Sequence, residues 1–233
     1  MGCGGYSELG SCAASCYICT TSHKKQVIFM RTSTKTPGQR GRPRSYDRDV
    51  ALGAICDVFW NEGFSASSLD DIAAAAGMNR PSLYAAFGDK REMYLAALQM
   101  FAAESGRELQ TALEAPTLRE ALEAFYARAI HDYLSGEDGP RGCLVICTAV
   151  TEAVREPAIR SALVAILADV DSVVAARIAR AQAAGEPCGR GDAKSLARVA
   201  TSVLHSLAVR ARAGEDRSEL EAIARATAEL IAS

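Results

Sequence analysis

The stretch from Ser67 to Lys90, SSLDDIAAAAGMNRPSLYAAFGDK, restricts the fold of this chain more than any other feature of its sequence. Apolar residues recur within it at spacings of three and four, which predicts two short helices. Gly77 suits the left-handed position that ends the first helix, and Asn79 can cap the start of the second. Asp89, with a glutamate three residues later, predicts the capped start of a third helix. Two short helices joined by a glycine turn are typical of a helix-turn-helix DNA reader.

This stretch resembles the TetR family of transcriptional regulators. The resemblance extends upstream through residues 50–64, VALGAICDVFWNEGF, which have the form of the family's first helix ending in a Gly–aromatic pair. It includes residues of the family type at Leu83, Tyr84, Phe87 and Lys90. The resemblance implies an all-α fold, in which an N-terminal three-helix helix-turn-helix DNA-binding domain precedes a C-terminal helical domain for ligand binding and dimerisation.

We divide the chain into four parts, residues 1–30, 31–45, 46–92 and 93–233, the first two by their composition and the last two by what the resemblance implies. The first part holds a CxxC pair, Cys16 and Cys19, which is a weak signal for zinc or redox chemistry. We interpret this part as a disordered extension, or as sequence upstream of a true start at Met30. The second part is a flexible basic arm. The third is the helix-turn-helix domain, and the fourth is the helical ligand-binding and dimerisation domain.

The charge distribution indicates how such a protein would hold DNA. The whole chain has a formal charge of -2 and a pI near 6.0, which gives no general sign of nucleic-acid binding. Residues 46–95 contain eight acidic and four basic residues, whereas residues 31–45 contain five basic residues and no acidic one. We therefore expect the arm to supply much of the cationic contact, and we expect binding to depend strongly on salt and on dimerisation.

The predicted DNA contacts are, in chain order, Arg42, Arg44, Ser67, Ser68, Asn79, Arg80, Ser82, Tyr84 and Lys90. The two arginines of the arm are expected in the minor groove or on its phosphates. Either serine of the 67–68 pair, Tyr84 and Lys90 are expected on phosphates, and the other three residues on base edges or adjacent phosphates. The two alanines after Tyr84 are small, so few side chains are expected to read bases.

Beyond residue 90 the chain shows only helical periodicity. The expected helices span about 90–113, 117–134, 157–184, 192–213 and 218–232, with a strongly apolar segment at 143–154. The last two helices from each subunit can form a four-helix bundle across a two-fold axis. Their apolar stripes consist of Leu196, Val199, Val203 and Leu207 in one helix, and of Leu220, Ile223, Thr227 and either Leu230 or Ile231 in the other. The alternative is that these stripes pack inside one subunit.

The resemblance also implies a ligand cavity among the C-terminal helices. Its candidate lining residues are Phe101, Phe125, Tyr126, Tyr133, Cys143, Cys147, Thr148 and Thr151, each of which could instead be core packing. Cys143 and Cys147 share one helix face, so a thiol-based sensor of oxidants or electrophiles is an alternative. Their apolar neighbours favour a core role, and their parallel orientation on that face disfavours a disulfide between them.

The sequence therefore favours a ligand-responsive repressor that binds a palindromic double-stranded DNA operator as a homodimer. A small apolar or amphipathic effector would release it. The chain contains no nucleophile–base pair, phosphate loop or set of metal ligands, so we expect no enzyme, no cofactor and no metal site. It also contains no run long and apolar enough for a membrane span, and we expect a cytoplasmic protein. A helical protein-interaction module is a less favoured alternative.

Overall fold

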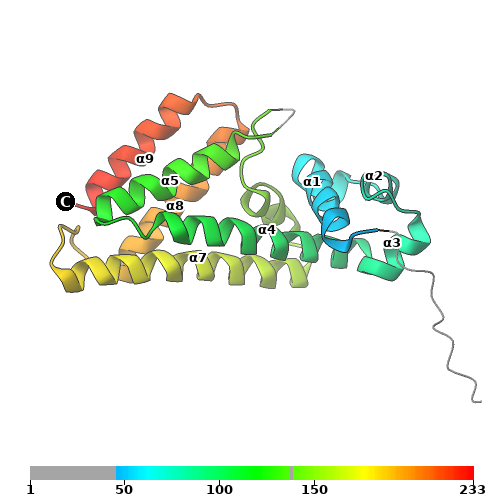
Figure 1. Ribbon diagram of the computed structural model, residues 1–233, viewed down its shortest axis with the longest axis horizontal. Coiled ribbons are helices and arrows are strands. Elements are labelled where there is room, and N and C mark those ends of the chain that lie inside the picture. The colour runs from blue at the N-terminus through cyan, green and yellow to red at the C-terminus, as the bar shows by residue number, and fades with distance from the viewer. Residues whose placement is uncertain (1–45, 137–138) are drawn as a thin grey trace, which may run out of the picture. The chain divides into compact units, whose positions relative to one another are not determined.

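The computed structural model describes residues 46–136 and 139–233, and every regular element within them is helical, as predicted (Figure 1). The elements are α1 (Arg48–Ala66), α2 (Leu69–Ala75), α3 (Arg80–Phe87), α4 (Lys90–Ala112), α5 (Leu118–Tyr133), η1 (Val145–Ala149), α6 (Val150–Glu152), α7 (Pro157–Ala184), α8 (Ala193–Arg212) and α9 (Arg217–Ile231). None of these helices combines the length and the apolar character that a membrane crossing requires. The predictions for residues 1–30 and for the arm, with Arg42 and Arg44, lie outside the described residues.

Side-chain caps fix the starts of α3 and α4, and a glycine follows the end of α2. The Asp89 carboxylate accepts a hydrogen bond from the Glu92 amide at 2.8 Å, and the Glu92 carboxylate accepts one from the Asp89 amide at 2.7 Å. These two bonds form the predicted capping box at the start of α4. Asn79 caps α3 by accepting a hydrogen bond from the Ser82 amide at 2.9 Å. Gly77, with a φ of 61°, takes the left-handed position after α2.

The apolar segment at residues 143–154 is less regular than the predicted helical pattern. It begins with the π-helical turn η1 and continues as the short helix α6. The Thr148 hydroxyl donates to the Leu144 carbonyl at 2.6 Å, and this is the carbonyl that the backbone amide of residue 148 would use in an α-helix. Turns of this kind within helices often lie at functional sites.

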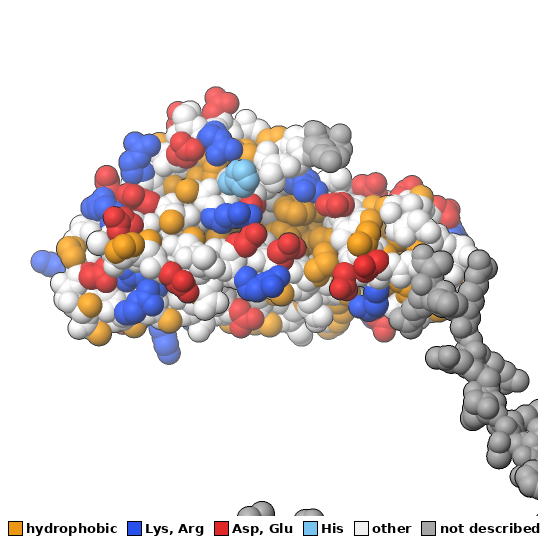
Figure 2. Space-filling model, viewed as in Figure 1, with side chains coloured by type: hydrophobic (Ala, Val, Ile, Leu, Met, Phe, Trp, Pro, Cys, Tyr) orange, Lys and Arg blue, Asp and Glu red, His pale blue; other side chains and the backbone are white. Residues whose placement is uncertain are grey.

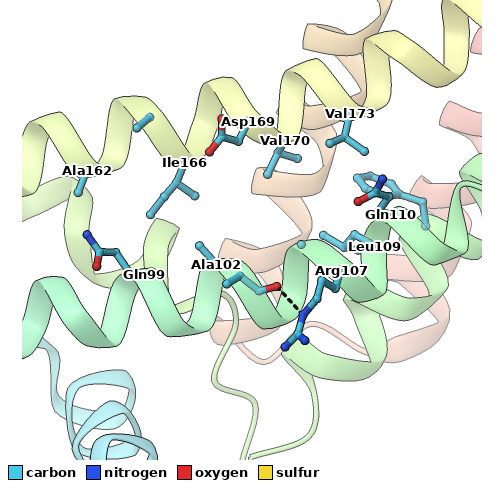
Figure 3. Close-up of a pocket in the computed structure, with 14 residues that line it drawn as sticks. Gln99, Ala102, Arg107, Leu109, Gln110, Ala162, Ile166, Asp169, Val170 and Val173 are labelled. Atoms are coloured by element: carbon cyan, nitrogen blue, oxygen red, sulfur yellow. Dashed lines mark hydrogen bonds between the residues drawn. The ribbon is translucent and has the colours of Figure 1, made fainter. Parts of the chain in front are cut away.

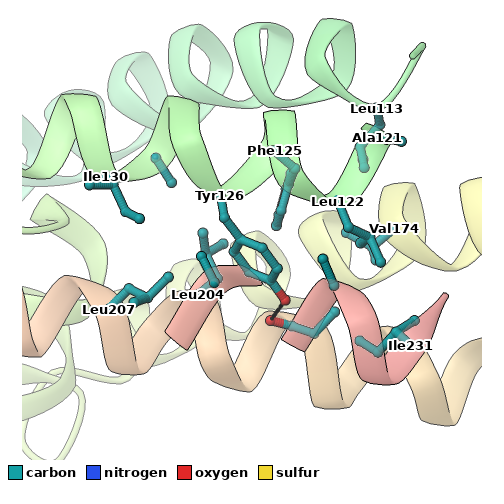
Figure 4. Packing of buried hydrophobic residues seen from close by; sticks show 14 of the residues in the cluster. Leu113, Ala121, Leu122, Phe125, Tyr126, Ile130, Val174, Leu204, Leu207 and Ile231 are labelled. Atoms are coloured by element: carbon teal, nitrogen blue, oxygen red, sulfur yellow. Dashed lines mark hydrogen bonds between the residues drawn. The ribbon is translucent and has the colours of Figure 1, made fainter. Parts of the chain in front are cut away.

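Two clusters of buried side chains form the core of the described residues. The first joins α1, α2, α3 and the start of α4 to η1 and the start of α7, with Phe59 and Leu144 among its members. The second joins α5, α8 and α9 to the later turns of α7, and Figure 4 shows Tyr126 and Leu204 within it. Because the first cluster contains residues from both sides of position 92, the domain boundary there remains a prediction.

The apolar stripes predicted to form a dimer interface lie mostly inside the subunit. Leu207, Leu220 and Ile231 are buried in the second cluster, whereas Val199 and Leu230 are 54% and 74% exposed. α8 packs on α7, and α9 packs on α5 and α8, so their apolar faces are largely used within one chain. For the buried members of the stripes, the alternative of packing within one subunit is therefore right.

Candidate nucleic-acid interface and cavity

Helices α2 and α3 form the helix-turn-helix that the sequence predicts. Leu83 and Phe87 are 0% and 6% exposed, and they fix the inner face of α3 against the first cluster. Ser82 and Tyr84 lie on the remaining faces and are exposed, Tyr84 by 45%. A helix held from one side with polar side chains on the other is the arrangement that enters a major groove.

Arg80, at the start of α3, is oriented by a partner on α2. Its Nε donates to Oδ1 of Asp70 at 2.7 Å, and its Nη2 donates to Oδ2 at 2.6 Å. The hydrogen bond from Arg80 lowers the pKa of the Asp70 carboxyl. This bidentate ion pair fixes the plane of the guanidinium and therefore the direction of the remaining N–H donors of Arg80. Sequence reasoning missed Asp70 because helical spacing does not show which residues of two different helices meet.

The predicted phosphate contacts differ in accessibility. Ser67 is 3% exposed and its hydroxyl donates to the Phe64 carbonyl at 3.2 Å, so little of its side chain is left for a phosphate. Ser68 is exposed and caps α2 by accepting a hydrogen bond from the Asp71 amide at 3.1 Å. The Lys90 ammonium lies 5.0 Å from the centre of the Phe64 ring, and partial burial lowers its pKa.

The surface around α1, α2 and α3 is not strongly cationic. On the face shown in Figure 2, acidic side chains predominate over this end of the molecule. One of its basic side chains, Arg48, lies with its guanidinium carbon 4.9 Å from the centre of the Phe87 ring. The distribution agrees with the excess of acidic residues counted in the sequence between positions 46 and 95.

A cavity of about 470 Å³ lies between α4 and α7. Figure 3 shows Leu109 of α4 and Ile166, Val170 and Val173 of α7 on its two walls, and Phe125 of α5 also lines it. Polar and charged side chains in the wall belong to Gln99, Arg107, Gln110 and Asp169. A second, smaller hollow of about 60 Å³ shares part of this wall and reaches α5, α8 and the segment before α6.

Four of the predicted ligand residues line these spaces and four do not. Phe125 lines the larger cavity, whereas Phe101, Tyr133 and Cys143 line the smaller hollow. The residues outside both linings are Tyr126, Cys147, Thr148 and Thr151. Tyr126 instead lies in the core, where its hydroxyl donates to the Ala200 carbonyl at 3.0 Å. Sequence reasoning missed the wall supplied by α7, because periodicity does not show which helix face borders a void.

The two cysteines considered as sensors are both partly buried. Burial raises the pKa of the Cys143 thiol to about 11. Burial also raises the pKa of Cys147, although the nearby Arg212 acts in the opposite direction. Both are free thiols. Since the thiolate is the reactive form, these environments make both side chains weak nucleophiles near neutral pH.

Comparison with known proteins places this arrangement in a family. The family model described as "Bacterial regulatory proteins, tetR family" matches residues 51–97, and the model described as "Tetracyclin repressor-like, C-terminal domain" matches residues 119–227. The HTH-type transcriptional repressor ComR of Escherichia coli K12 is 31% identical over 195 residues, which cover 82% of this chain and 91% of ComR.

Solved structures give the same result. A cysteine-substituted variant of the TetR family regulator CifR, complexed with 26bp double-strand operator DNA, is 32% identical with a TM-score of 0.75, covering 82% of this chain and 100% of that one. The reduced form of E. coli NemR is 19% identical with a TM-score of 0.71, covers 79% of this chain and 96% of that one, and supports the fold alone.

A helix-turn-helix domain joined to a helical domain with a cavity between two of its helices defines a DNA-binding transcriptional regulator. Two models of this family match the N-terminal and the C-terminal helical parts of the chain, and ComR is similar to it along most of the length of both proteins. The chain belongs to the TetR family of transcriptional regulators.

Proposed function

We propose that this regulator is a repressor that binds a palindromic operator as a homodimer and leaves it when a small effector binds. The observation that carries the proposal is the exposed face of α3, where Arg80, Ser82 and Tyr84 are presented on a helix held from behind. ComR, a relative over most of its length, is a repressor, and CifR has been solved on operator DNA. The relatives are regulators, so we propose regulation and not catalysis. A cytoplasmic location remains a prediction.

The homodimer would use the outer faces of α8 and α9. The exposed residues that recur at helical spacing on these faces are Val199, Ser202, Ser206 and Val209 of α8, and Ala222, Ala226 and Leu230 of α9. They are small or apolar, so two such helix pairs can approach closely and form a four-helix contact across a two-fold axis. The same axis would place the two α3 helices on the two half-sites of a palindrome.

The effector would occupy the cavity between α4 and α7. Its wall is mostly apolar, with Gln99, Arg107, Gln110 and Asp169 as polar and charged groups, which suits an apolar or amphipathic molecule that carries a polar end. α4 begins at Lys90, three residues after α3 ends, and it forms one wall of the cavity. A shift of α4 on effector binding would therefore reach the reader helix.

A thiol-based sensor is the second candidate. Cys143 lines the smaller hollow, and the solved CifR chain carries substituted cysteines, which together favour testing it. The raised pKa of both thiols ranks it below an apolar effector. DNA binding of the Cys143→Ser, Cys147→Ser double variant should be compared with that of the wild type, with and without hydrogen peroxide. An equal response to peroxide in the two proteins excludes these thiols as the sensor.

A gel-shift series over a range of salt tests the DNA-binding part of the proposal. The probe is the DNA upstream of this protein's own gene, and the competitor is a scrambled duplex. We expect specific binding that Arg80→Ala and Tyr84→Ala each weaken by about tenfold, corresponding to a lost base or phosphate contact of about 1–3 kcal/mol. Arg190→Ala, at an exposed site in the loop before α8, is the control and should bind normally. No DNA affinity at low salt rejects the proposal.

A further inference from the structure

The segment of residues 141–149, which we name the coupling segment, lies between the cavity and the DNA-binding helices. On one side, Cys143 and Ile146 line the smaller hollow. On the other side, η1 contacts α1, and the Thr148 hydroxyl forms a hydrogen bond of 2.6 Å with the Tyr94 hydroxyl of α4. One short segment therefore contacts the hollow on one side and, on the other, helices α1 and α4, which pack against the helix-turn-helix.

Trp60, in the later part of α1, contacts both the coupling segment and the wall of the hollow. Its indole N–H donates to the Gly142 carbonyl at 3.2 Å, and the Arg141 guanidinium carbon lies 4.1 Å from its ring centre. Arg141 also pairs with Asp57, one turn earlier in α1, at 2.7 Å. The Trp60 ring meets Phe101 edge-on, with ring centres 4.7 Å apart, and Phe101 lines the hollow.

Arg212, the last residue of α8, joins three carbonyl groups from two parts of the chain. Its Nη1 donates to the carbonyls of Trp60 at 3.1 Å and Arg141 at 3.2 Å, and its Nη2 donates to the carbonyl of Asn61 at 3.2 Å. The backbone of α1 is interrupted at Gly63, so two of these carbonyls lie near a helix end, where a cation is favoured. α8 itself forms part of the wall of the hollow.

Close packing at Gly142 couples the segment to α8. Its φ is +64°, and a Cβ at this position would lie 2.5 Å from the Ala208 carbonyl oxygen and 2.8 Å from Sγ of Cys147. The Cys147 thiol donates to the same carbonyl at 3.8 Å. The backbone at Gly142 therefore lies against α8 with no room for a side chain, so a shift of the segment toward α8 must also displace the end of that helix.

We infer that Arg212 and the coupling segment transmit occupancy of the smaller hollow, which shares part of its wall with the cavity, to α1 and thereby to the DNA-binding helices. This inference rests on the proposed function. An effector that moves Cys143 also moves Gly142, whose carbonyl accepts from Trp60, and Arg141, whose carbonyl accepts from Arg212. An effector that moves Phe101 acts directly on the Trp60 ring, and α1 packs on α2 and α4. Arg212 is a positioning residue, since it lines neither cavity. Coupling between two sites is reciprocal, so DNA binding must also change the coupling segment.

The test uses the full-length protein and a DNA duplex selected from a random pool, and needs no effector. Amide hydrogen exchange is measured with and without that duplex for the wild type, Arg212→Met and Arg210→Met. Methionine keeps much of the apolar stem of arginine but cannot donate to the three carbonyls. Arg210 pairs on the surface with Glu215 at 2.8 Å and is the matched control.

In the wild type and in Arg210→Met, we expect DNA to protect α3 and to change exchange in residues 139–152 by about fivefold or more. In Arg212→Met, protection of α3 persists while the change in residues 139–152 is lost. Protection of α3 in the wild type with no change in residues 139–152 overturns the link and leaves the proposed function standing. An equal change in Arg212→Met overturns the role of Arg212. If no duplex protects α3, the proposed function fails and the link fails with it.

A second variant guards against an Arg212→Met protein that does not fold. Arg141→Met removes the pair with Asp57 and the contact with the Trp60 ring, but leaves the backbone carbonyl that Arg212 uses. We expect it to lose the same DNA-dependent change in residues 139–152. Retention of the wild-type change in a folded Arg141→Met protein contradicts the inference.

Discussion

At the scale of single residues, a contact between α2 and α3 decides how the Arg80 side chain is oriented toward DNA. The pair of Arg80 and Asp70 is exposed at both ends, so water screens it and it contributes little to stability. Its effect is geometrical, because it holds the guanidinium in one plane before DNA arrives. A fixed guanidinium discriminates between base edges better than a freely rotating one, since less freedom is lost on binding.

We therefore expect Asp70→Asn to weaken discrimination while strengthening general affinity. The change removes a negative charge near the DNA and releases Arg80, so the ratio of Kd for a scrambled duplex to Kd for a selected operator should fall about tenfold, or about 1.4 kcal/mol. Both constants are measured by fluorescence anisotropy at one salt concentration. Asp49→Asn, at an exposed acidic residue of α1, is the control. An unchanged ratio would show that the orientation of Arg80 by Asp70 does not contribute to discrimination between DNA sequences.

Gly142→Ala tests the packing of the coupling segment. A Cβ there meets the Ala208 carbonyl at 2.5 Å on a left-handed backbone, so we expect a loss of about 1–3 kcal/mol in the free energy of unfolding. Gly53→Ala is the matched control, because Gly53 lies within α1 with no atom within 4 Å of the added carbon. Alanine is the better helix former, so this control should gain up to about 1 kcal/mol. Urea denaturation followed by circular dichroism measures both, and equal stability of the two variants contradicts the packing argument.

At the scale of elements, the sequence predicts where helices begin better than which faces they bury. The capping residues Asn79, Asp89 and Thr117 all cap helices in the structure, since a cap is a local hydrogen bond between neighbours in the chain. The π-helical turn η1 depends on where Thr148 finds its partners, Leu144 and Tyr94, and one of these is far away in sequence. Burial of Leu207 and Ile231 likewise depends on which helices pack against them.

The proposed dimer interface is tested on α8 and α9. Adding charge to it with Val199→Glu and Leu230→Glu should produce a monomer with nearly unchanged thermal stability, because both side chains are exposed in the subunit. Val164→Glu, on an equally exposed valine of α7, is the control and should remain a dimer. Light scattering after size-exclusion chromatography measures the mass. A dimer that survives the double substitution places the interface elsewhere.

At the scale of the whole molecule, charge is divided unevenly along the chain. Residues 46–95 hold eight acidic and four basic residues, whereas residues 31–45 hold five basic ones. Phosphate contact releases counterions, so the part of the chain that supplies the cations sets the salt dependence of binding. We therefore expect the arm, more than the helix-turn-helix, to set affinity for DNA of any sequence.

Two truncations test this division. A chain that begins at residue 46 lacks the arm, and we expect its affinity for DNA to fall by about a hundredfold and its plot of log K against log salt to flatten by several units. A chain that begins at Met30 keeps the arm and should bind like the full-length protein. Equal salt dependence in all three proteins would show that the helix-turn-helix supplies the phosphate contacts itself.

The sequence by itself determined the all-α class, the helix-turn-helix and the caps around it, because these depend on spacing and on hydrogen bonds between near neighbours. Only the tertiary structure decided that Asp70 orients Arg80, that Ser67 is buried, and that α7 walls the cavity. It also decided that Arg212 reaches α1 across some 150 positions of the chain. Such contacts join residues that are far apart in the sequence at no regular spacing, so periodicity along the chain cannot predict them.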